Sequence, residues 1–261
     1  MYENMPNNIH HAAQQGFSSA AELYQQTRPS YPQEIKNWLE SDLKINENST
    51  VIDLGSGTGK FLPYLIAQGS EVIAVEPVTE MLEQLRKKYP SVKTVQASSE
   101  QLPFHSESID AVLCAQSFHW FANIETLNEI HQVLKPKGHL GLIWNQRDIE
   151  VDWVKALADY IAQFEGDTPR YHSGQWKKVF ENQFLFELTD VKVYSQLQKG
   201  TVENVVSNRL LSTSFIAAMS QEKQLEMKQN FEKIVFDFTG KTAQDEIEFP
   251  YITYAYHFHK I

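Results

Sequence analysis

A glycine-rich turn behind a short apolar run carries the residues best suited to chemistry in this chain. Residues 50–54 are mostly apolar, and the turn that follows has glycine at positions 55, 57 and 59. Glycine adopts positive φ and has no Cβ, so a backbone of this kind can lie close against a ligand. Glu76 ends the next apolar run, where a carboxylate can accept both hydroxyls of an adenosine ribose. This order of strand, glycine turn, helix, strand and acidic residue predicts a nucleoside-binding site.

The spacing of the glycines separates two classes of cofactor. Nicotinamide enzymes carry G-x-G-x-x-G, and here the third glycine comes one residue early, with Lys60 in its place. The segment from Asp53 to Gly59 reads D-x-G-x-G-x-G, which is similar to the pattern of S-adenosylmethionine (SAM) methyltransferases. No second mononucleotide-binding half follows residue 148, although a nicotinamide enzyme of this type would have one. We therefore expect SAM as the cofactor.

The elements that must hold these residues alternate along the chain. Short apolar runs alternate with helix-length amphipathic stretches from residue 50 onward, which predicts a parallel α/β sheet that is doubly wound, with helices on both faces. The expected strands cover residues 50–54, 71–76, 92–96, 111–115, 139–144, 188–194 and 249–259, and the last can pair antiparallel. The expected helices between them cover residues 59–68, 78–88 and 124–134, followed by two amphipathic helices around 202–219 and 221–238.

The remaining segments predict one domain with two additions. Residues 1–17 are polar and predict a flexible tail, and residues 18–261 predict a single domain. Two short helices, opening at Ser19 and at Pro32, form the expected N-terminal helical lid. The aromatic-rich stretch of about 149–187 breaks the alternation and predicts a helical cap insertion over the ends of the strands.

Several motifs together carry a resemblance to a known family. These are Tyr24-x-x-x-Arg28-Pro29-x-Tyr31-Pro32, the run Gln116-Ser117-Phe118-His119-Trp120-Phe121, Val133-Leu134-Lys135-Pro136-Lys137-Gly138, and Trp144-Asn145-x-Arg147-Asp148. With the glycine turn, they resemble class I SAM-dependent methyltransferases of the type 11 group, and more narrowly the trans-aconitate methyltransferase-like branch. The resemblance covers about residues 18–148 and departs at Lys137-Gly138, where the family usually has two glycines. It implies a Rossmann-like, seven-stranded class I methyltransferase fold.

The resemblance also implies a role for each matching residue. Asp53 would hold the methionine amino group of SAM, Glu76 the ribose, and Ser98 with the Ser99 backbone N–H the adenine edge. The full set of residues implied to bind SAM, and its product S-adenosylhomocysteine, is Tyr24, Arg28, Asp53, Gly55, Ser56, Gly57, Glu76, Pro77, Ser98, Ser99 and Gln116.

Arg28 lies between the two expected N-terminal helices, beside Tyr24 and Tyr31. Arginine is rarely buried without a partner, and its forked guanidinium can bind a carboxylate in two places. We therefore expect the Arg28 guanidinium to bind the carboxylate of SAM or of an acidic substrate. The alternative is a surface arginine that closes a turn.

His119 follows the fourth expected strand, where the resemblance places residues next to the reactive methyl group. It is the candidate catalytic residue and can act as a general base. Alternatively, His119 and Trp120 line the pocket and orient the sulfonium without taking a proton. Trp120, Trp144 and Arg147 are the candidate substrate residues. Arg147, Arg170 and Arg209 can recognise an acidic acceptor, although a surface cation is the more ordinary interpretation of each one alone. Asp148 is expected to pair with Arg147, so no metal site is predicted.

Composition excludes several classes of partner and place. A net charge of −10 repels nucleic acid, and no window has the run of about 18 apolar residues that a membrane span needs. Cys114 is the single cysteine, which excludes a disulfide framework and indicates a reducing compartment. The first 16 residues lack the apolar core of a signal peptide, so a cytoplasmic location is expected.

The sequence as a whole predicts a SAM-dependent methyltransferase that acts on a small-molecule acceptor. A carboxylate oxygen is the first choice of accepting atom, because the resemblance points to it. Two alternatives stay open, namely a SAM-binding regulatory protein without turnover and a nicotinamide-dependent oxidoreductase. The number of subunits has no signal in the sequence.

Overall fold

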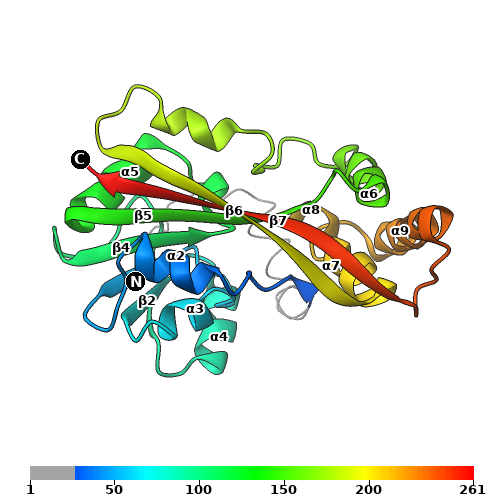
Figure 1. The fold of residues 1–261 in the computed structure, drawn as a ribbon, viewed down its shortest axis with the longest axis horizontal. Helices are drawn as coiled ribbons and strands as arrows, with labels where there is room; N and C mark the ends of the chain where they lie inside the picture. Colours follow the sequence, from blue (N-terminus) through cyan, green and yellow to red (C-terminus); the bar gives the residue numbers. More distant parts are fainter. Residues whose placement is uncertain (1–26) are drawn as a thin grey trace, which may run out of the picture.

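A seven-stranded mixed sheet organises the chain (Figure 1). The structure is a computed structural model that describes residues 27–261, so Tyr24, the expected tail and the helix expected to open at Ser19 lie outside it. The predicted α/β architecture with a sheet of seven strands is confirmed. The strand order is β3-β2-β1-β4-β5-β7-β6, and the strands are β1 (Thr50–Leu54), β2 (Glu71–Val75), β3 (Lys93–Val95), β4 (Ile109–Ala115), β5 (Leu134–Arg147), β6 (Phe186–Thr201) and β7 (Glu246–Lys260).

The parallel half of the sheet reverses its direction of growth beside β1. Strands β1, β2 and β3 pair outward in sequence, and the chain then returns so that β4 pairs with the other edge of β1. Asp53, near the end of β1, is opposite Ala74 of β2 and Leu113 of β4. In open α/β sheets, ligands bind outside the carboxyl ends of the strands at such a reversal. The fold therefore places Asp53 and the glycine turn at the position where a ligand is expected.

The last two strands make the sheet mixed. β7 pairs antiparallel with both β5 and β6, as the sequence allowed for its last strand. Both strands are longer than predicted, and β6 and β7 stay paired from Phe186↔Lys260 to Thr201↔Glu246. Their length carries the sheet well beyond its parallel half, as Figure 1 shows.

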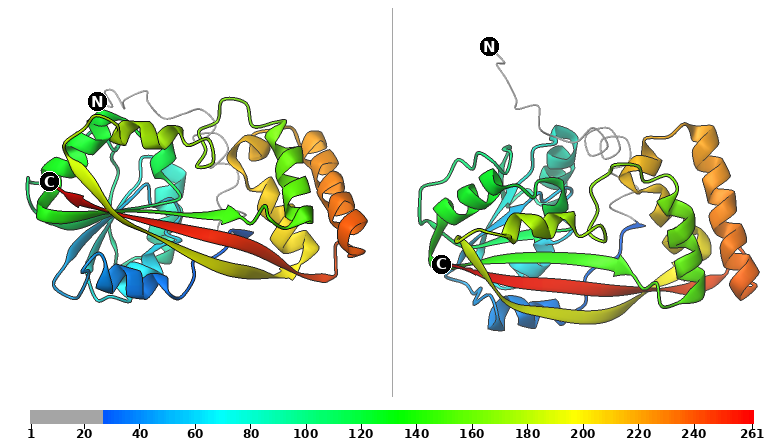
Figure 2. Two further views of the ribbon diagram at one scale, coloured as in Figure 1. Left: turned by 45° about the horizontal axis from the view of Figure 1, so that its top comes forward. Right: turned by 90° about the horizontal axis from the view of Figure 1, so that it is seen from above.

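Helices cover both faces of the parallel half (Figure 2). The helices α2 (Ile35–Ser41), α3 (Leu62–Ile66) and α4 (Thr79–Lys88) contribute to the core on one face. The helices α5 (Ile124–Val133) and η2 (Gln175–Phe180) contribute to the core on the other. The second lid helix, expected at Pro32, corresponds to α2, whose Trp38 and Leu39 are buried as its apolar face predicts.

A third core forms around the extended ends of the long strands. It contains α6 (Asp152–Ala162), η3 (Val202–Asn208), α7 (Arg209–Leu211), α8 (Ser214–Ala217) and α9 (Gln221–Thr239), here called the helical subdomain. Phe249 and Tyr251 of β7 are buried in the same core. The segment 149–187, expected as one cap, is divided, because α6 packs in this core and Trp176 of η2 packs on the sheet.

The single helix predicted around 202–219 is wrong. The chain forms a π-helical turn and two short α-helices there, and Thr213 interrupts them with an extended backbone at φ −72° and ψ 132°. Ser212, Thr213 and Ser214 are consecutive, and short hydroxyl side chains compete with helical hydrogen bonds and favour a helix start. The apolar periodicity of the segment hides this break.

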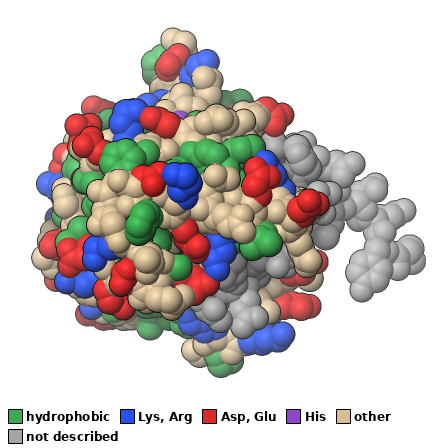
Figure 3. All heavy atoms as spheres, turned by 90° about the vertical axis from the view of Figure 1, so that its right-hand side faces the viewer, with side chains coloured by type: hydrophobic (Ala, Val, Ile, Leu, Met, Phe, Trp, Pro, Cys, Tyr) green, Lys and Arg blue, Asp and Glu red, His purple; other side chains and the backbone are tan. Residues whose placement is uncertain are grey.

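The outer surface of the helical subdomain carries mixed side chains. Figure 3 views the molecule from the end that carries this subdomain, and acidic, basic and hydrophobic side chains are interspersed there. None of the helices in residues 27–261 combines the length and the apolar character that crossing a bilayer requires.

Candidate functional site

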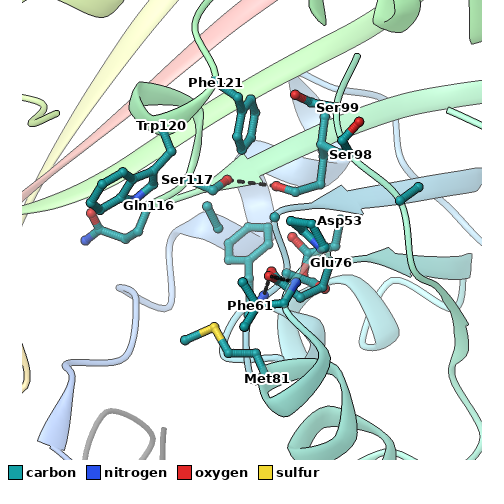
Figure 4. Close-up of a pocket in the computed structure, with 18 of the residues that line it drawn as sticks. Asp53, Phe61, Glu76, Met81, Ser98, Ser99, Gln116, Ser117, Trp120 and Phe121 are labelled. Atoms are coloured by element: carbon teal, nitrogen blue, oxygen red, sulfur yellow. Dashed lines mark hydrogen bonds between the residues drawn. The ribbon is translucent and has the colours of Figure 1, made fainter. Parts of the chain in front are cut away.

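A cavity of about 610 Å³ lies at the carboxyl ends of β1, β2 and β4 and is called here the main cavity. In Figure 4, Gln116 and Trp120 lie on the opposite side of this cavity from Ser98 and Ser99. Every residue predicted to bind SAM within the described chain lines it, namely Arg28, Asp53, Gly55, Ser56, Gly57, Glu76, Pro77, Ser98, Ser99 and Gln116. The structure therefore brings together residues that are spread over 89 positions of sequence, from 28 to 116.

The glycine turn is held by both neighbouring strands. The backbone N–H of Gly55 donates to the Val75 carbonyl at 2.8 Å, and the Ser117 hydroxyl donates to the Leu54 carbonyl at 2.7 Å. Gly55 has φ +68°, and a Cβ added to it would lie 2.6 Å from the Cβ of Ser117. Only glycine fits this position, because both the backbone angle and the space exclude a side chain.

Asp53 is a buried acid without a partner. Its side chain is fully buried, and both carboxylate oxygens lack a hydrogen-bond partner among the described residues. Burial, with a smaller effect from the charge of Glu76, raises the pKa of Asp53 from its ordinary 3.8 to about 7. Buried charges are normally paired or hydrogen-bonded, so this wall of the cavity fits a ligand that brings a cationic or hydrogen-bonding group.

Glu76 is tied to the glycine turn. Its two carboxylate oxygens accept hydrogen bonds from the backbone N–H groups of Gly57 at 2.8 Å and Val78 at 3.0 Å (Figure 4). Burial raises the pKa of Glu76 to about 7, and the two N–H groups oppose that shift. A carboxylate has about four acceptor positions, so Glu76 keeps lone pairs for two hydroxyl groups of a ligand.

The wall beyond Glu76 is formed by Pro77, Val78 and Met81 on one side and Ser98 and Ser99 on the other. The Ser99 hydroxyl is 2.8 Å from the Thr126 hydroxyl of α5, and the Ser99 side chain is buried. Its backbone is thus the part of Ser99 that remains for a ligand in the cavity, in line with the role implied for its N–H.

Gln116 stands where the main cavity meets a second one. It has φ +59°, which is uncommon outside glycine, and its side-chain amide donates to the Asn145 carbonyl at 3.0 Å. Strained backbone persists where the surrounding structure holds it, often at functional sites. Gln116 lines both cavities.

The second cavity has a volume of about 50 Å³ and is called here the basic pocket. It adjoins the main cavity through shared lining residues, among them Arg28 and Gln116. The candidate catalytic and substrate residues His119, Trp120, Trp144 and Arg147 all line it. The other polar or aromatic residues that line it include Arg170, Tyr171, Arg209 and Ser214.

The basic pocket concentrates positive charge. Arg209 is 6% exposed, and its Nε and Nη1 atoms are buried without a hydrogen-bond partner among the described residues. Burial, with the charges of Arg170 and Arg209, lowers the pKa of Arg147 to about 10. The carboxylate of Glu165 lies 3.8 Å from Arg170 Nε. A buried guanidinium with two nitrogens that lack a hydrogen-bond partner, beside other cations, fits an anionic ligand.

The predicted ion pair between Arg147 and Asp148 is wrong. No ion pair joins the two residues in the described structure, and Asp148 instead accepts a hydrogen bond from the Glu150 backbone at 3.2 Å. The strand β5 ends at Arg147, whose side chain lines the pocket, and Asp148 begins the turn before α6. Among residues 27–261, no cluster of acidic, histidine or cysteine residues suits a metal ion.

Arg28 links the start of the described chain to the helical subdomain. Its Nη2 donates to the Ser212 carbonyl at 2.9 Å, and its Nε donates to the Ser212 hydroxyl at 3.2 Å. Arg28 lines both cavities, so a clamp on the carboxylate of SAM and a contact with an acidic acceptor both stay predictions.

His119 is held by a tryptophan. Trp144 Nε1 donates to His119 Nδ1 at 3.0 Å. Burial lowers the pKa of His119 to about 3, and the charges of Arg170, Arg28 and His172 lower it further. An efficient general base has a pKa near the working pH, so this imidazole is poorly suited to remove protons at neutral pH.

For some residues of the site, the sequence does not specify the contacts that the structure shows. Asn145 donates to the Ser30 carbonyl at 3.0 Å and accepts from the Thr253 hydroxyl at 2.6 Å, so it fixes the segment that carries Arg28 over the end of β5. Arg209 falls in a stretch whose apolar pattern predicts a plain amphipathic helix. Both roles depend on contacts between segments more than 100 positions apart, which a single sequence does not reveal.

Comparisons with known proteins agree on one family. The family model described as "Methyltransferase domain" matches residues 52–142. An uncharacterized methyltransferase-like protein of Schizosaccharomyces pombe is 37% identical over 234 residues, covering 89% of this chain and 91% of that protein. An uncharacterized methyltransferase of Mycobacterium tuberculosis is 34% identical over 215 residues, covering 76% and 86%. The solved structure of a candidate type II methyltransferase from Anaeromyxobacter dehalogenans has a TM-score of 0.65 at 18% identity, covering 89% and 97%.

Proposed function

Because the chain belongs to the class I SAM-dependent methyltransferases, we propose that it transfers a methyl group to a carboxylate oxygen of a small molecule held in the basic pocket. The observation that carries the choice of acceptor is Arg209, whose Nε and Nη1 atoms are buried without a hydrogen-bond partner among the described residues. The finer resemblance to the trans-aconitate methyltransferase-like branch supports the same accepting group.

The main cavity fits SAM at both of its polar ends. The unpaired carboxylate of Asp53 suits the amino group of the methionine part, and Glu76 suits the ribose hydroxyls. The wall of Pro77, Ser98 and Ser99 then holds the adenine. When bound, SAM supplies a methyl group on a positively charged sulfur, and S-adenosylhomocysteine is the product.

The basic pocket fits the acceptor. A guanidinium binds a carboxylate through two parallel hydrogen bonds, and Arg147, Arg170 and Arg209 supply such groups from three separate segments of the chain. A carboxylate oxygen attacks the methyl carbon with its own lone pair, and the electrons of the breaking bond stay on sulfur. No proton has to be removed, so the reaction needs alignment more than base catalysis.

The test uses SAM with a labelled methyl group and a panel of small carboxylic acids, with the matching amides and alcohols as controls. We expect label in acids only, and release of labelled methanol on alkaline treatment, since alkali cleaves methyl esters and leaves N-methyl groups and ethers intact. Label that survives alkali would contradict the carboxylate acceptor.

Calorimetry tests the two alternative functions. Binding of SAM without methyl transfer to any compound would favour a binding protein without turnover. Binding of a nicotinamide dinucleotide in place of SAM would favour the oxidoreductase.

A charge-removing substitution locates the acceptor. We expect Arg209→Gln to raise the KM for the best acid of the panel about 10- to 100-fold, because a hydrogen bond to a charged group contributes roughly 1.5–3 kcal/mol. The affinity for SAM, measured by calorimetry, should change little. Arg86→Gln on the exposed face of α4 removes the same charge far from the pocket and is the matched control. An unchanged KM in Arg209→Gln would show that the acceptor binds elsewhere.

A further inference from the structure

The hydrogen bond between Trp144 and His119 fixes where the imidazole carries its proton. The indole N–H is a donor only, so the ring nitrogen that it meets must be an acceptor. Trp144 Nε1 lies 3.0 Å from His119 Nδ1, which therefore carries a lone pair. A neutral imidazole with a lone pair on Nδ1 has its hydrogen on Nε2, and an imidazolium cannot accept this bond at all.

The indole itself has little freedom to move. Trp144 is fully buried in β5, and its ring centroid lies 4.5 Å from that of Trp176 and 5.0 Å from that of Tyr171. The ring of Tyr256 packs edge-on against it at 5.8 Å. A side chain packed on several sides in a sheet strand is a rigid support, so the donor stays aimed at His119.

We infer that Trp144 holds His119 as the neutral tautomer with hydrogen on Nε2, so that the imidazole donates a hydrogen bond to the acceptor and takes no proton from it. Trp144 is then a positioning residue, and His119 is the group that touches the acceptor. This inference rests on the proposed function, since it takes a carboxylate as the group that His119 meets.

The surroundings of His119 favour this assignment. His119 lines the basic pocket, and the bond from Trp144 occupies Nδ1, so Nε2 is the ring nitrogen that remains for a ligand. The ionisable groups that line the pocket around it are Arg28, Arg147, Arg170, Tyr171 and Arg209. His172 adds a further repulsion, and burial with the bond to Tyr256 raises the pKa of Tyr171. The pocket thus offers mainly hydrogen-bond donors, which suits a ligand group, such as a carboxylate, that only accepts hydrogen bonds.

A donor at this place has a definite use. A carboxylate has two oxygens, and a hydrogen bond to the oxygen that does not attack leaves the attacking lone pair intact. The bond orients the carboxylate, and proximity and orientation are the main needs of a displacement at a methyl group. The general-base role predicted as one option for His119 is thereby replaced by a donor role.

The first test reads the tautomer directly, without acceptor or activity. In full-length protein labelled with ¹⁵N, long-range ¹H–¹⁵N correlations distinguish protonated from unprotonated ring nitrogens, and the spectrum of His119→Gln identifies the His119 signals. We expect hydrogen on Nε2 alone from about pH 5 to about pH 8, the range where an ordinary histidine titrates. We also expect a scalar coupling between Trp144 Nε1 and His119 Nδ1 across their hydrogen bond. Hydrogen on Nδ1, or an imidazolium at neutral pH, would overturn the inference.

Substitution of the indole then tests the positioning role. Trp144→Phe keeps an aromatic ring and removes the donor, so we expect the single tautomer to give way to a mixture. Trp176→Phe removes another buried indole, whose N–H donates to the Tyr171 carbonyl, and should leave the His119 tautomer unchanged. An unaltered tautomer in folded Trp144→Phe would overturn the role of Trp144. If that variant does not fold, the coupling in the unsubstituted protein decides the question, and its absence would equally overturn it.

Activity with the best acid of the panel separates donor from base. Glutamine can present an N–H near the position of Nε2 but cannot accept a proton, so we expect His119→Gln to retain kcat/KM within about tenfold. Loss of a general base would cost about 10²- to 10⁴-fold in the same variant, and that result would overturn the donor role. If no acid of the panel is methylated, the proposed function fails, whereas the tautomer measurement still decides the state of His119.

Discussion

Asp53 and Glu76 are buried at the wall of the main cavity, and burial raises the pKa of each to about 7. A carboxyl group with a raised pKa binds its proton more tightly in the folded chain than in the unfolded one. Its contribution to stability is therefore complete below about pH 4 and is lost as the pH rises through about 7. In the absence of a ligand, the protein is expected to become less stable over this interval.

Asp53→Asn tests this cost at a single residue. The amide cannot ionise, so the melting temperature of the variant without ligand should fall less than that of the unsubstituted protein as the pH rises from about 5 to about 8. Differential scanning calorimetry across that interval measures the two slopes. Glu83→Gln, on an exposed position of α4, removes a carboxylate that is already in water and should keep the original slope. Equal slopes of melting temperature against pH for Asp53→Asn and the unsubstituted protein would show that the pKa of Asp53 is not raised by folding.

At the scale of an element, the turn after β1 depends on the absence of a side chain at position 55. Gly55→Ala should destabilise the protein by about 1–2 kcal/mol for the left-handed backbone and by about 1–3 kcal/mol more for overpacking against Ser117. Gly174→Ala is the matched control, since Gly174 has φ +70° and no heavy atom within 4 Å of an added Cβ. Urea denaturation of both variants gives the two free energies of unfolding. Equal losses would show that the contact with Ser117 adds nothing.

Elements with a clear local pattern of apolar residues can be predicted from the sequence. The strands β1 and β2 and the helix α5 lie within a residue or two of their predicted bounds, because their apolar periods are local. The strand β6 is longer than predicted, since its outer residues are partly exposed and only the pairing with β7 defines them. The helix break at Thr213 was missed, because its apolar neighbours keep a helical spacing on both sides.

At the scale of the whole molecule, charge makes a prediction about partners. The chain has 33 acidic and 23 basic residues, so its overall field repels a phosphate backbone even though one pocket is rich in arginine. In an electrophoretic mobility assay at moderate salt, we expect neither RNA nor duplex DNA to be retarded by the protein. Retardation that weakens steeply with added salt would contradict this prediction and would indicate a basic surface that engages phosphates.

The residues that line the main cavity could be predicted from the sequence alone. Asp53 lies in β1, the glycines lie in the turn after it, and Glu76 directly follows the adjacent strand β2. The hydrogen bond from Gly57 to Glu76 joins positions only 19 apart, so one strand-turn-helix-strand unit contains the residues of this pattern. These local requirements leave a readable pattern. The family and the fold follow from the same pattern, and both predictions are confirmed.

The basic pocket depends on how distant segments of the chain pack together. Arg28, Arg147, Arg170 and Arg209 come from four separate segments, and they converge because the long strands β5 and β7 carry the helical subdomain back against the end of the parallel sheet. The contact of Trp144 with His119 arises in the same way, between neighbouring strand ends. Each arginine is ordinary in sequence, and its significance comes from burial beside other cations, a property of packing that no local pattern encodes.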